Sequence, residues 1–229
     1  MISVIIPTLN EEEALPTLLD FLCKHPARNE FEVLIIDGGS SDGTLKICSE
    51  RPVQVIHSEK ASRAAQMNIG AAAASGDILY FVHADAVPPE SFVNDIKQAQ
   101  TDGFQSGCYR FRFDRKPYFL LYINEFFTRF PFSWCRGGDQ TLFITKVLFE
   151  ELRGYNEEHV IMEDYEFLER LQNVASFKIL PKSVKVSSRK YKHNSYLQVQ
   201  VANFRAMRMY KSGVPPLEIK VFYKKALTF

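Results

Sequence analysis

The stretch FEVLIIDGGSSDGT (Phe31–Thr44) predicts a buried strand, a sharp turn and the start of a helix. Its first six residues are mostly apolar, Asp37 closes the run, and two glycines then let the backbone turn sharply. Comparable apolar runs, separated by helical patterns, lie at Ser3–Pro7, Val53–His57 and Asp77–His83. This alternation predicts an α/β fold with a mostly parallel central sheet flanked by helices.

The second half of the chain is less regular and richer in aromatic residues. We expect strands at Gln105–Phe113, Thr141–Thr145 and Val184–Ser188, and helices at Tyr118–Phe130, Lys146–Leu152, Asp164–Val174 and Ser195–Tyr210. The sequence contains no internal repeat and no linker-like tract. We therefore expect a single domain over residues 1–229, with a nucleotide-binding half (1–103), an acceptor and catalytic half (104–190) and a C-terminal helical extension (191–229).

Composition and charge narrow the class of protein. A chain with 46% hydrophobic and 24% charged residues is typical of a soluble globular protein, and the net charge of +1 gives no reason to expect a nucleic-acid partner. The four scattered cysteines form no CxxC pair, which favours free thiols and a cytoplasmic location. The tail LEIKVFYKKALTF (217–229) mixes aromatic and basic residues, so peripheral membrane contact, docking on the body and homo-oligomer formation all stay open.

Polar residues follow three of the predicted strands. PTLNEE (Pro7–Glu12) ends the first, Asp37 ends the second, and His83-Ala84-Asp85 ends the fourth. The carboxyl ends of parallel strands meet at one edge of a sheet, so these residues are expected to border one crevice. Asp37 could accept the ring N–H of uracil or guanine, although capping its own turn is equally well supported. Asp85 could hold Mg²⁺ or Mn²⁺ against a diphosphate.

An acidic pair, Glu163-Asp164, opens the helical pattern of MEDYEF (Met162–Phe167). Acids at a helix N-terminus often interact only with the helix dipole. The sharper hypothesis makes Asp164 a general base that deprotonates an acceptor hydroxyl. Arg63, which opens a helix just after a strand, is the best candidate to contact phosphate, and Arg136 and Arg189 are weaker ones.

These motifs, in this order, resemble the family 2 glycosyltransferases with the GT-A (nucleotide-diphospho-sugar transferase) fold over roughly residues 2–190. The closest resemblance is to the arsenosugar-biosynthesis or radical-SAM/selenodomain-associated group. The matching stretches are PTLNEE, DGGSSDGT, SRAAQMNIGA, GDILYFVHADAVPP, GGDQTLF and MEDYEF. The resemblance implies that a sugar passes from a nucleotide-diphosphate donor, with UDP favoured, to a hydroxyl of a small-molecule or lipid acceptor, with inversion.

The resemblance also implies a set of site residues. Asp164 is the expected catalytic base, assisted by Glu163, and Asp85 is the expected ligand of a Mg²⁺ or Mn²⁺ cofactor. The donor-binding residues are expected to be Pro7, Thr8, Asn10, Glu12, Asp37, Gly39, Arg63, Asn68, His83, Ala84 and Asp85. The acceptor-binding residues are expected to be Trp134, Gly138, Asp139 and Gln140.

Two departures from the family pattern qualify this expectation. Gly38 and His83 stand where the family usually has a second acid and the first acid of a D-x-D motif. The Q-x-x-R-W signature of processive synthases is missing after Asp164, so we expect a single addition. Phosphate-binding glycine motifs are also missing, which disfavours P-loop and dinucleotide-binding proteins. A sugar nucleotidyltransferase and a non-catalytic nucleotide-sugar-binding protein are the alternatives.

Overall fold

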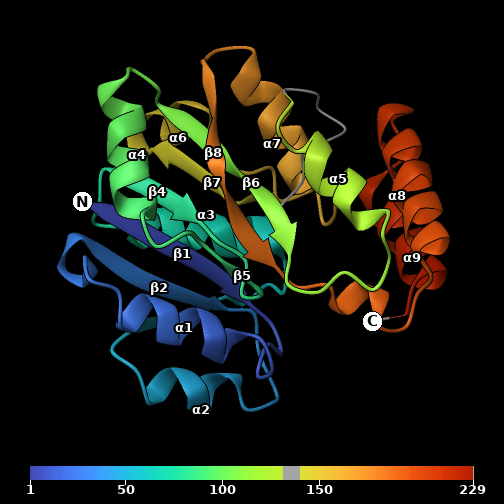
Figure 1. Ribbon diagram of the computed structural model, residues 1–229. Coiled ribbons are helices and arrows are strands. Elements are labelled where there is room, and N and C mark those ends of the chain that lie inside the picture. The colour runs from blue at the N-terminus through green and yellow to red at the C-terminus, as the bar shows by residue number, and fades with distance from the viewer. Residues whose placement is uncertain (131–139, 229) are drawn as a thin grey trace.

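The computed structural model describes residues 1–130 and 140–228. Within them, eight strands form one sheet in the order β3-β2-β1-β4-β7-β6-β8-β5 (Figure 1). Their bounds are β1 (Ile2–Thr8), β2 (Phe31–Asp37), β3 (Gln54–His57), β4 (Ile78–Phe81), β5 (Ala86–Val87), β6 (Ser106–Phe113), β7 (Leu142–Thr145) and β8 (Phe177–Val186). Strands β1 to β4 pair in parallel, as do β6 and β8, while β7 is antiparallel to β4 and β6 and β5 is antiparallel to β8. The predicted α/β class, with a mostly parallel sheet in a single domain, is confirmed.

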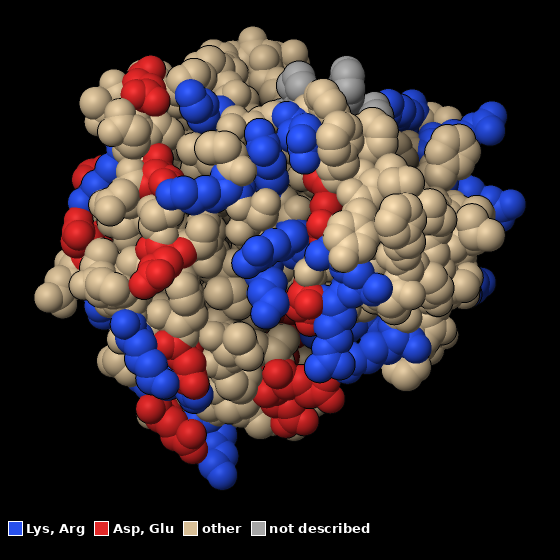
Figure 2. All heavy atoms as spheres, in the orientation of Figure 1, with Lys and Arg blue, Asp and Glu red and all other residues tan. Residues whose placement is uncertain are grey.

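Helices cover both faces of this sheet. Their bounds are α1 (Leu15–Cys23), α2 (Thr44–Ser49), α3 (Arg63–Ala73), α4 (Phe92–Thr101), α5 (Leu121–Phe127), α6 (Lys146–Glu151), α7 (Glu163–Gln172), α8 (Tyr196–Lys211) and α9 (Pro216–Ala226). Helices α8 and α9 stand beside α5 at one side of the molecule (Figure 1), where the surface shows few acidic side chains (Figure 2). No helix within 1–130 and 140–228 is long and apolar enough to cross a membrane.

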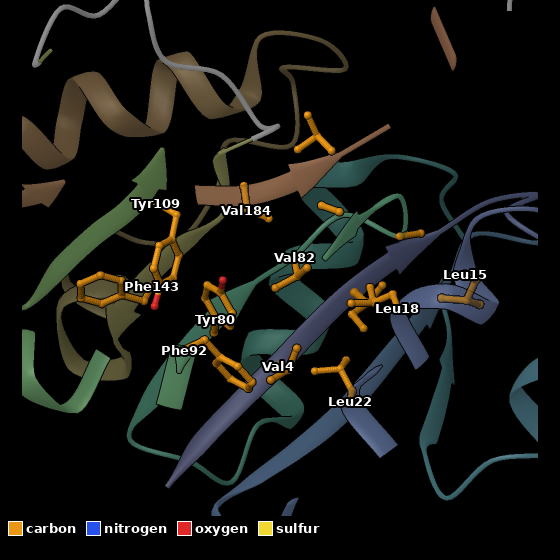
Figure 3. Packing of buried hydrophobic residues seen from close by; sticks show 14 of the residues in the cluster. Val4, Leu15, Leu18, Leu22, Tyr80, Val82, Phe92, Tyr109, Phe143 and Val184 are labelled. Carbon is orange, nitrogen blue, oxygen red and sulfur yellow. The ribbon is translucent and has the colours of Figure 1, made fainter. Parts of the chain in front are cut away.

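Two apolar layers fix the helices on the sheet. Helices α1 and α4 pack on one face, where β1 contributes Ile2, Val4 and Ile6. Helices α3, α6 and α7 pack on the other face, where β1 contributes Ile5. Figure 3 shows the first layer, with leucines of α1 lying against Val4. Alternate residues of β1 therefore support opposite layers, and the strand is buried along its whole length.

A stripe of leucines explains why α1 forms and which way it faces. Leu15, Leu18, Leu19 and Leu22 are fully buried, and their spacing places them on one side of the helix. Burying one leucine contributes roughly 1.5–3 kcal/mol, so the four together anchor α1 firmly. The preceding loop, which carries Asn10 to Glu13, is thereby held at the end of β1.

Helix α3 lies unusually close to the sheet. A Cβ atom placed on Gly70 would come within 2.4 Å of the Ile5 side chain, so only glycine allows this approach. The first turn of α3, which begins at Arg63, is consequently held over the ends of β1 and β2.

The structure differs from the sequence expectations at three elements. Strand β8 begins at Phe177 rather than Val184, because pairing with β6 continues past a bulge beside Tyr109. Its polar positions, such as Lys178 and Lys182, hide the strand pattern. Strand β5 has only two residues and depends on β8 for its pairing. The extension expected to be helical over residues 191–229 contains, beyond the helix expected at Ser195–Tyr210, a further helix α9 with Pro216 in its first turn.

Candidate active site

The turn after β2 is organised by Asp37, whose side chain is completely buried. Its Oδ2 accepts hydrogen bonds from the backbone N–H groups of Gly39 and Ser40, each at 2.9 Å. Its Oδ1 accepts the hydroxyls of Ser40 at 2.6 Å and Thr8 at 3.4 Å. Gly39 has φ +92°, a conformation that strains other residues. These contacts match the turn-capping role, and contact between Asp37 and a base stays a prediction.

The contacts of Asp37 predict a large loss of stability on its removal. We expect Asp37→Ala to lower the free energy of unfolding by about 3 kcal/mol, because buried N–H and O–H groups lose a charged partner. Chemical denaturation measures this change. The control is Asp77→Ala, since that side chain is 92% exposed and pairs with the N-terminal amine at the surface. A loss no larger than that of the control would show that the turn does not depend on Asp37.

The loop after β1 is bonded to the same turn. Asn10, which has a positive φ of 56°, accepts the N–H of Ser41 at 2.8 Å. Glu12 accepts the N–H of Gly43 at 2.7 Å. Of the other predicted donor residues here, Pro7 lies within β1 opposite Ile36. The two loops thus form one bonded unit at the ends of β1 and β2.

Helix α3 connects this unit to the opposite side of the crevice. The buried side chain of Gln66 donates hydrogen bonds to the carbonyl oxygens of Thr8 at 2.8 Å and Ile36 at 2.6 Å. One turn earlier, Arg63 lies 3.9 Å from the carboxylate of Glu163, across to the start of α7. Gln66 was not among the predicted site residues. A glutamine among the alanines of an apolar helix face could have indicated a buried polar contact.

The start of α7 presents the two predicted catalytic acids differently. Met162, just before the helix, has φ +63°, a left-handed backbone conformation that is strained for a residue other than glycine. Glu163 is 5% exposed and faces Arg63, so its position suits holding the two sides of the site together. Asp164 is partly exposed.

Asn68 fixes the loop that leads into α7. Its Oδ1 accepts the N–H of Tyr155 at 2.8 Å, and its Nδ2 donates to the carbonyl of Tyr155 at 2.9 Å and to Glu157 at 3.3 Å. Glu157 in turn forms an ion pair with Lys60. The structure therefore places Asn68, predicted to bind the donor, against the loop that positions Asp164.

Asp164 lines a cavity of about 20 Å³, the size of a single water molecule, together with His83, Gln140 and Tyr155. These four residues come from distant parts of the chain. Burial, followed by the nearby carboxylates of Asp164 and Glu163, raises the pKa of Tyr155 well above its usual value, so its hydroxyl stays protonated. The predicted Asp164, His83 and Gln140 are therefore neighbours. Trp134, Gly138 and Asp139 lie outside the described residues.

Asp85 is held in the turn after β4, in which the Ala86 N–H donates to the His83 carbonyl at 3.0 Å. His83 and Ala84 are buried, whereas the Asp85 side chain is 22% exposed. Its Oδ2 lies 3.3 Å from Nε of Arg189. The same guanidinium donates two hydrogen bonds, of 2.6 and 2.8 Å, to the carboxylate of Glu11. These bonds raise the pKa of Arg189 further, with the Asp85 charge adding to the effect, so it is charged at any physiological pH.

A second, larger cavity of about 680 Å³ opens beside this ion pair. Asp85 and Arg189 form part of its wall, and other parts include Lys116, Lys185 and Lys192. The loop carrying Arg189 is fixed by Asp114, which accepts the N–H of Ser188 at 2.8 Å. The cavity thus joins an acidic side chain to several basic ones, a combination that suits an anionic ligand accompanied by a cation.

The description Glycosyl transferase family 2 applies to a family model that matches residues 3–160 of this chain. The chain belongs to glycosyltransferase family 2. A PGL/p-HBAD biosynthesis glycosyltransferase of Mycobacterium tuberculosis is 28% identical over 187 residues, which cover 73% of this chain and 68% of that protein.

Solved glycosyltransferase structures share the fold. The mannosyltransferase PcManGT from Pyrobaculum calidifontis, in complex with GDP-Man and Mn²⁺, has a TM-score of 0.70 and 17% identity, covering 98% of this chain and 68% of that one. Glucosyl-3-phosphoglycerate synthase from Mycobacterium tuberculosis, in complex with Mn²⁺, UDP and phosphoglyceric acid, has a TM-score of 0.61 and 19% identity, covering 94% of this chain and 79% of that one. The predicted GT-A fold is thereby confirmed for this glycosyltransferase.

The site of this family 2 glycosyltransferase fits a cation that arrives with its ligand. The described residues contain no group of three His, Cys, Asp or Glu side chains able to hold an ion alone. Mg²⁺ is commonly bound by one or two carboxylates together with substrate phosphates. Asp85 offers one partly exposed carboxylate at the wall of the larger cavity, which meets that requirement.

Proposed function

We propose that this glycosyltransferase moves one sugar per cycle from a nucleotide-diphosphate donor to an acceptor hydroxyl, with inversion at the anomeric carbon. The observation that carries the proposal is the chain of contacts around the carboxyl edge of the sheet. Asp164 shares a cavity with His83, Asp85 follows two residues later, and Arg189 connects Asp85 to Glu11 after β1. These contacts support a proton acceptor and a diphosphate-binding charge pair on adjoining parts of one edge.

The donor occupies the ends of β1, β2 and β4 in this proposal. The bonded loops after β1 and β2 receive the base, through Thr8, Asn10 and Asp37, and Arg63 faces the phosphates. UDP is the favoured nucleotide, and the UDP bound in the related mycobacterial synthase structure supports it, although PcManGT carries GDP-Man.

Asp85 is the residue that would hold Mg²⁺ or Mn²⁺ on the diphosphate. When bound, such an ion neutralises negative charge that develops on the leaving nucleoside diphosphate. The Mn²⁺ in both neighbouring structures supports a divalent cation. Arg189 provides a second positive charge on the same side. The cation and the guanidinium would together stabilise the negative charge on the diphosphate, most strongly where water is excluded.

Asp164 acts as the general base. It takes the proton of the acceptor hydroxyl while the oxygen attacks the anomeric carbon from the face opposite the diphosphate, and the bond from that carbon to the diphosphate oxygen breaks with its electron pair. Glu163, paired with Arg63, keeps the start of α7 aligned with the donor side. Attack from the opposite face accounts for inversion.

Gln140 is the described residue that we place on the acceptor side, beside Asp164. A small molecule or a lipid could supply the hydroxyl. The motifs named above support the arsenosugar or radical-SAM-associated subgroup, and the free thiols of Cys23 and Cys48 support a cytoplasmic location. In this proposal, residues 1–103 bind the nucleotide, residues 104–190 carry the acceptor and catalytic groups, and residues 191–229 form the C-terminal helical extension.

A ligand panel tests the function. The protein is mixed with UDP- and GDP-sugars, with and without Mn²⁺, and binding is followed by thermal shift, transfer by nucleotide release, and product configuration by NMR. Donor binding with an inverted product supports the proposal. Pyrophosphate release from a sugar phosphate and a nucleoside triphosphate indicates a nucleotidyltransferase instead, and binding without turnover indicates a binding protein.

Removing Arg189 is expected to weaken donor binding when no metal is present. We expect Arg189→Gln to raise the Kd for UDP in EDTA by about 10- to 100-fold, because a charge-assisted contact to phosphate is lost. Added Mn²⁺ should recover most of the affinity, since the variant leaves Asp85 available. Calorimetry measures both constants, and Arg51→Gln, which removes an arginine paired with Asp20, is the control. Unchanged affinity in EDTA would remove Arg189 from the diphosphate site.

A further inference from the structure

The large apolar side chains that the described residues expose are concentrated on three helices. Ten of fourteen belong to α5 and the turn before it, to α8 or to α9. They are Phe119, Leu120, Tyr122, Ile123, Phe126, Leu197, Val201, Phe204, Leu217 and Val221. Isolated exposed apolar residues are ordinary, but a gathering of them marks a surface that contacts something.

The spacing of these residues makes each helix apolar on two sides. On α8, Leu197, Val201 and Phe204 follow one another at helical intervals on the solvent side, whereas Val199 and Ala202 are buried on the other. On α9, Leu217 and Val221 are exposed while Ile219 is buried. Packing onto the body explains the buried stripes and leaves the exposed ones unexplained.

The three helices are neighbours at one side of the molecule (Figure 1). The hydroxyl of Tyr196 on α8 donates to Asn124 on α5 at 3.0 Å, and the hydroxyl of Tyr223 on α9 donates to Asn203 on α8 at 2.6 Å. Figure 2 shows a broad uncharged area over these helices, bordered by Lys and Arg side chains. We call this area, formed by α5, α8 and α9, the apolar–basic surface.

The C-terminal extension, residues 191–229, carries a net charge opposite in sign to that of the rest of the chain. Residues 191–229 contain seven Lys or Arg and one acid, Glu218, which gives +6, so residues 1–190 carry −5 within the total of +1. Helix α8 has no acid and ends in Arg205, Arg208 and Lys211. Such an asymmetry, on amphipathic helices, is typical of proteins that bind an anionic surface.

We propose that the apolar–basic surface docks this chain on an anionic lipid bilayer. The exposed stripes of α5, α8 and α9 enter the boundary between headgroups and acyl chains, and the basic side chains around them contact lipid phosphates. The chain then lies on one leaflet without crossing it. This inference concerns a surface outside the candidate active site and does not rest on the proposed glycosyl transfer.

Charge complementarity favours lipid over a second copy of the chain. A twofold dimer through this surface would bring together two copies of the C-terminal extension, each with a net charge of +6 over residues 191–229, because both copies contribute the same patch. Like charges at the border of an interface oppose such an association. A layer of anionic headgroups meets both the apolar and the basic parts.

Docking in this way brings the bilayer next to the larger cavity. Lys116, just before α5, and Tyr191 and Lys192, at the start of the extension, line the cavity whose wall contains Asp85. An acceptor carried by a lipid would therefore reach the site without leaving the membrane surface.

Vesicle cosedimentation of the full chain tests the proposal. We expect binding to phosphatidylglycerol–phosphatidylcholine vesicles, little binding to phosphatidylcholine alone, and a decrease at high salt. Leu197→Ser with Phe204→Ser should weaken binding at least about tenfold, as should Arg205→Glu with Arg208→Glu. The two apolar side chains are 70% and 67% exposed, so folding is preserved. The matched control is Val147→Ser, on α6, where the side chain is 63% exposed.

Two results would overturn the proposal. One is an absence of binding to anionic vesicles, or equal binding by the wild type, the two double variants and the control. The other is sedimentation velocity showing a dimer that Phe204→Ser dissociates, which would assign the surface to a second copy. Asp164→Asn should bind vesicles like the wild type, so a failure of the catalytic proposal leaves this test unaffected.

Discussion

Asp164→Asn is expected to lower the rate of sugar transfer by about a thousandfold, within the range found for loss of a general base. The amide keeps the size of the side chain but cannot accept the acceptor proton. Asp164 is partly exposed and the amide matches the carboxylate in shape, so the helix and the sheet should be preserved. Nucleoside diphosphate release measured at saturating acceptor, together with the melting temperature, separates a chemical defect from a folding defect.

Two comparisons sharpen this test. Glu169→Gln removes an acid from the same helix, where Glu169 accepts a hydrogen bond from Tyr210 rather than lining the cavity, and it should keep normal turnover. The Kd for UDP should also stay unchanged in Asp164→Asn, because the base acts on the acceptor. Near-normal turnover in Asp164→Asn would show that another group removes the proton.

Much of the fold could be predicted because its signals are local. The apolar run Phe31–Asp37 is β2 residue for residue, and the four leucines of α1 are buried on the face that their spacing predicts. The order of βα units then fixes where the strands end. Asp37, His83 and Asp85 could be placed at one edge of the sheet without any knowledge of side-chain contacts.

What each side chain does at that edge could not be read from local sequence. Arg189 meets Glu11 across 178 positions in the chain, so no pattern joins them, and only a weak phosphate role was predicted for this arginine. Asn68 was assigned to the donor on its motif, yet its amide is bonded to the loop before α7. The sequence allowed Asp37 either to cap its turn or to bind a base. The four hydrogen bonds that its carboxylate accepts match the capping role, and they are visible only in the folded structure.

The extension shows the same limit in another form. Its positive charge is visible in the sequence, but whether Leu197 and Phe204 face the core or solvent depends on how α8 meets the body. The aromatic pattern of Tyr118–Phe130 predicts a helix but not which side chains are covered, and the structure leaves Phe126 46% exposed. Tertiary packing, rather than periodicity, decides which stripe of a doubly apolar helix is covered.

Asp85→Ala is expected to reduce transfer by about a hundredfold to a thousandfold. A cation on a leaving diphosphate contributes several kcal/mol to the transition state, and each 1.36 kcal/mol is a factor of ten. The free energy of unfolding should change by no more than about 1 kcal/mol, because the Asp85–Arg189 pair is partly exposed and Arg189 retains Glu11. Calorimetry of UDP binding with and without Mn²⁺ measures directly how much the cation tightens the Kd. Glu13→Ala, in the same cavity wall, is the control.

The variants of the two paired residues should respond to metal in opposite ways. Without Asp85, Mn²⁺ should no longer tighten UDP binding, whereas affinity in EDTA should be retained through Arg189. Without Arg189, affinity in EDTA should fall while the gain from Mn²⁺ persists or grows, because the carboxylate no longer faces a guanidinium 3.3 Å away. If the Asp85–Arg189 contact merely held the turn together, the Kd for UDP in EDTA and the Kd in Mn²⁺ would change equally in both variants. If Asp85→Ala keeps the full gain from Mn²⁺, the ion is bound elsewhere and Asp85 serves only to orient Arg189.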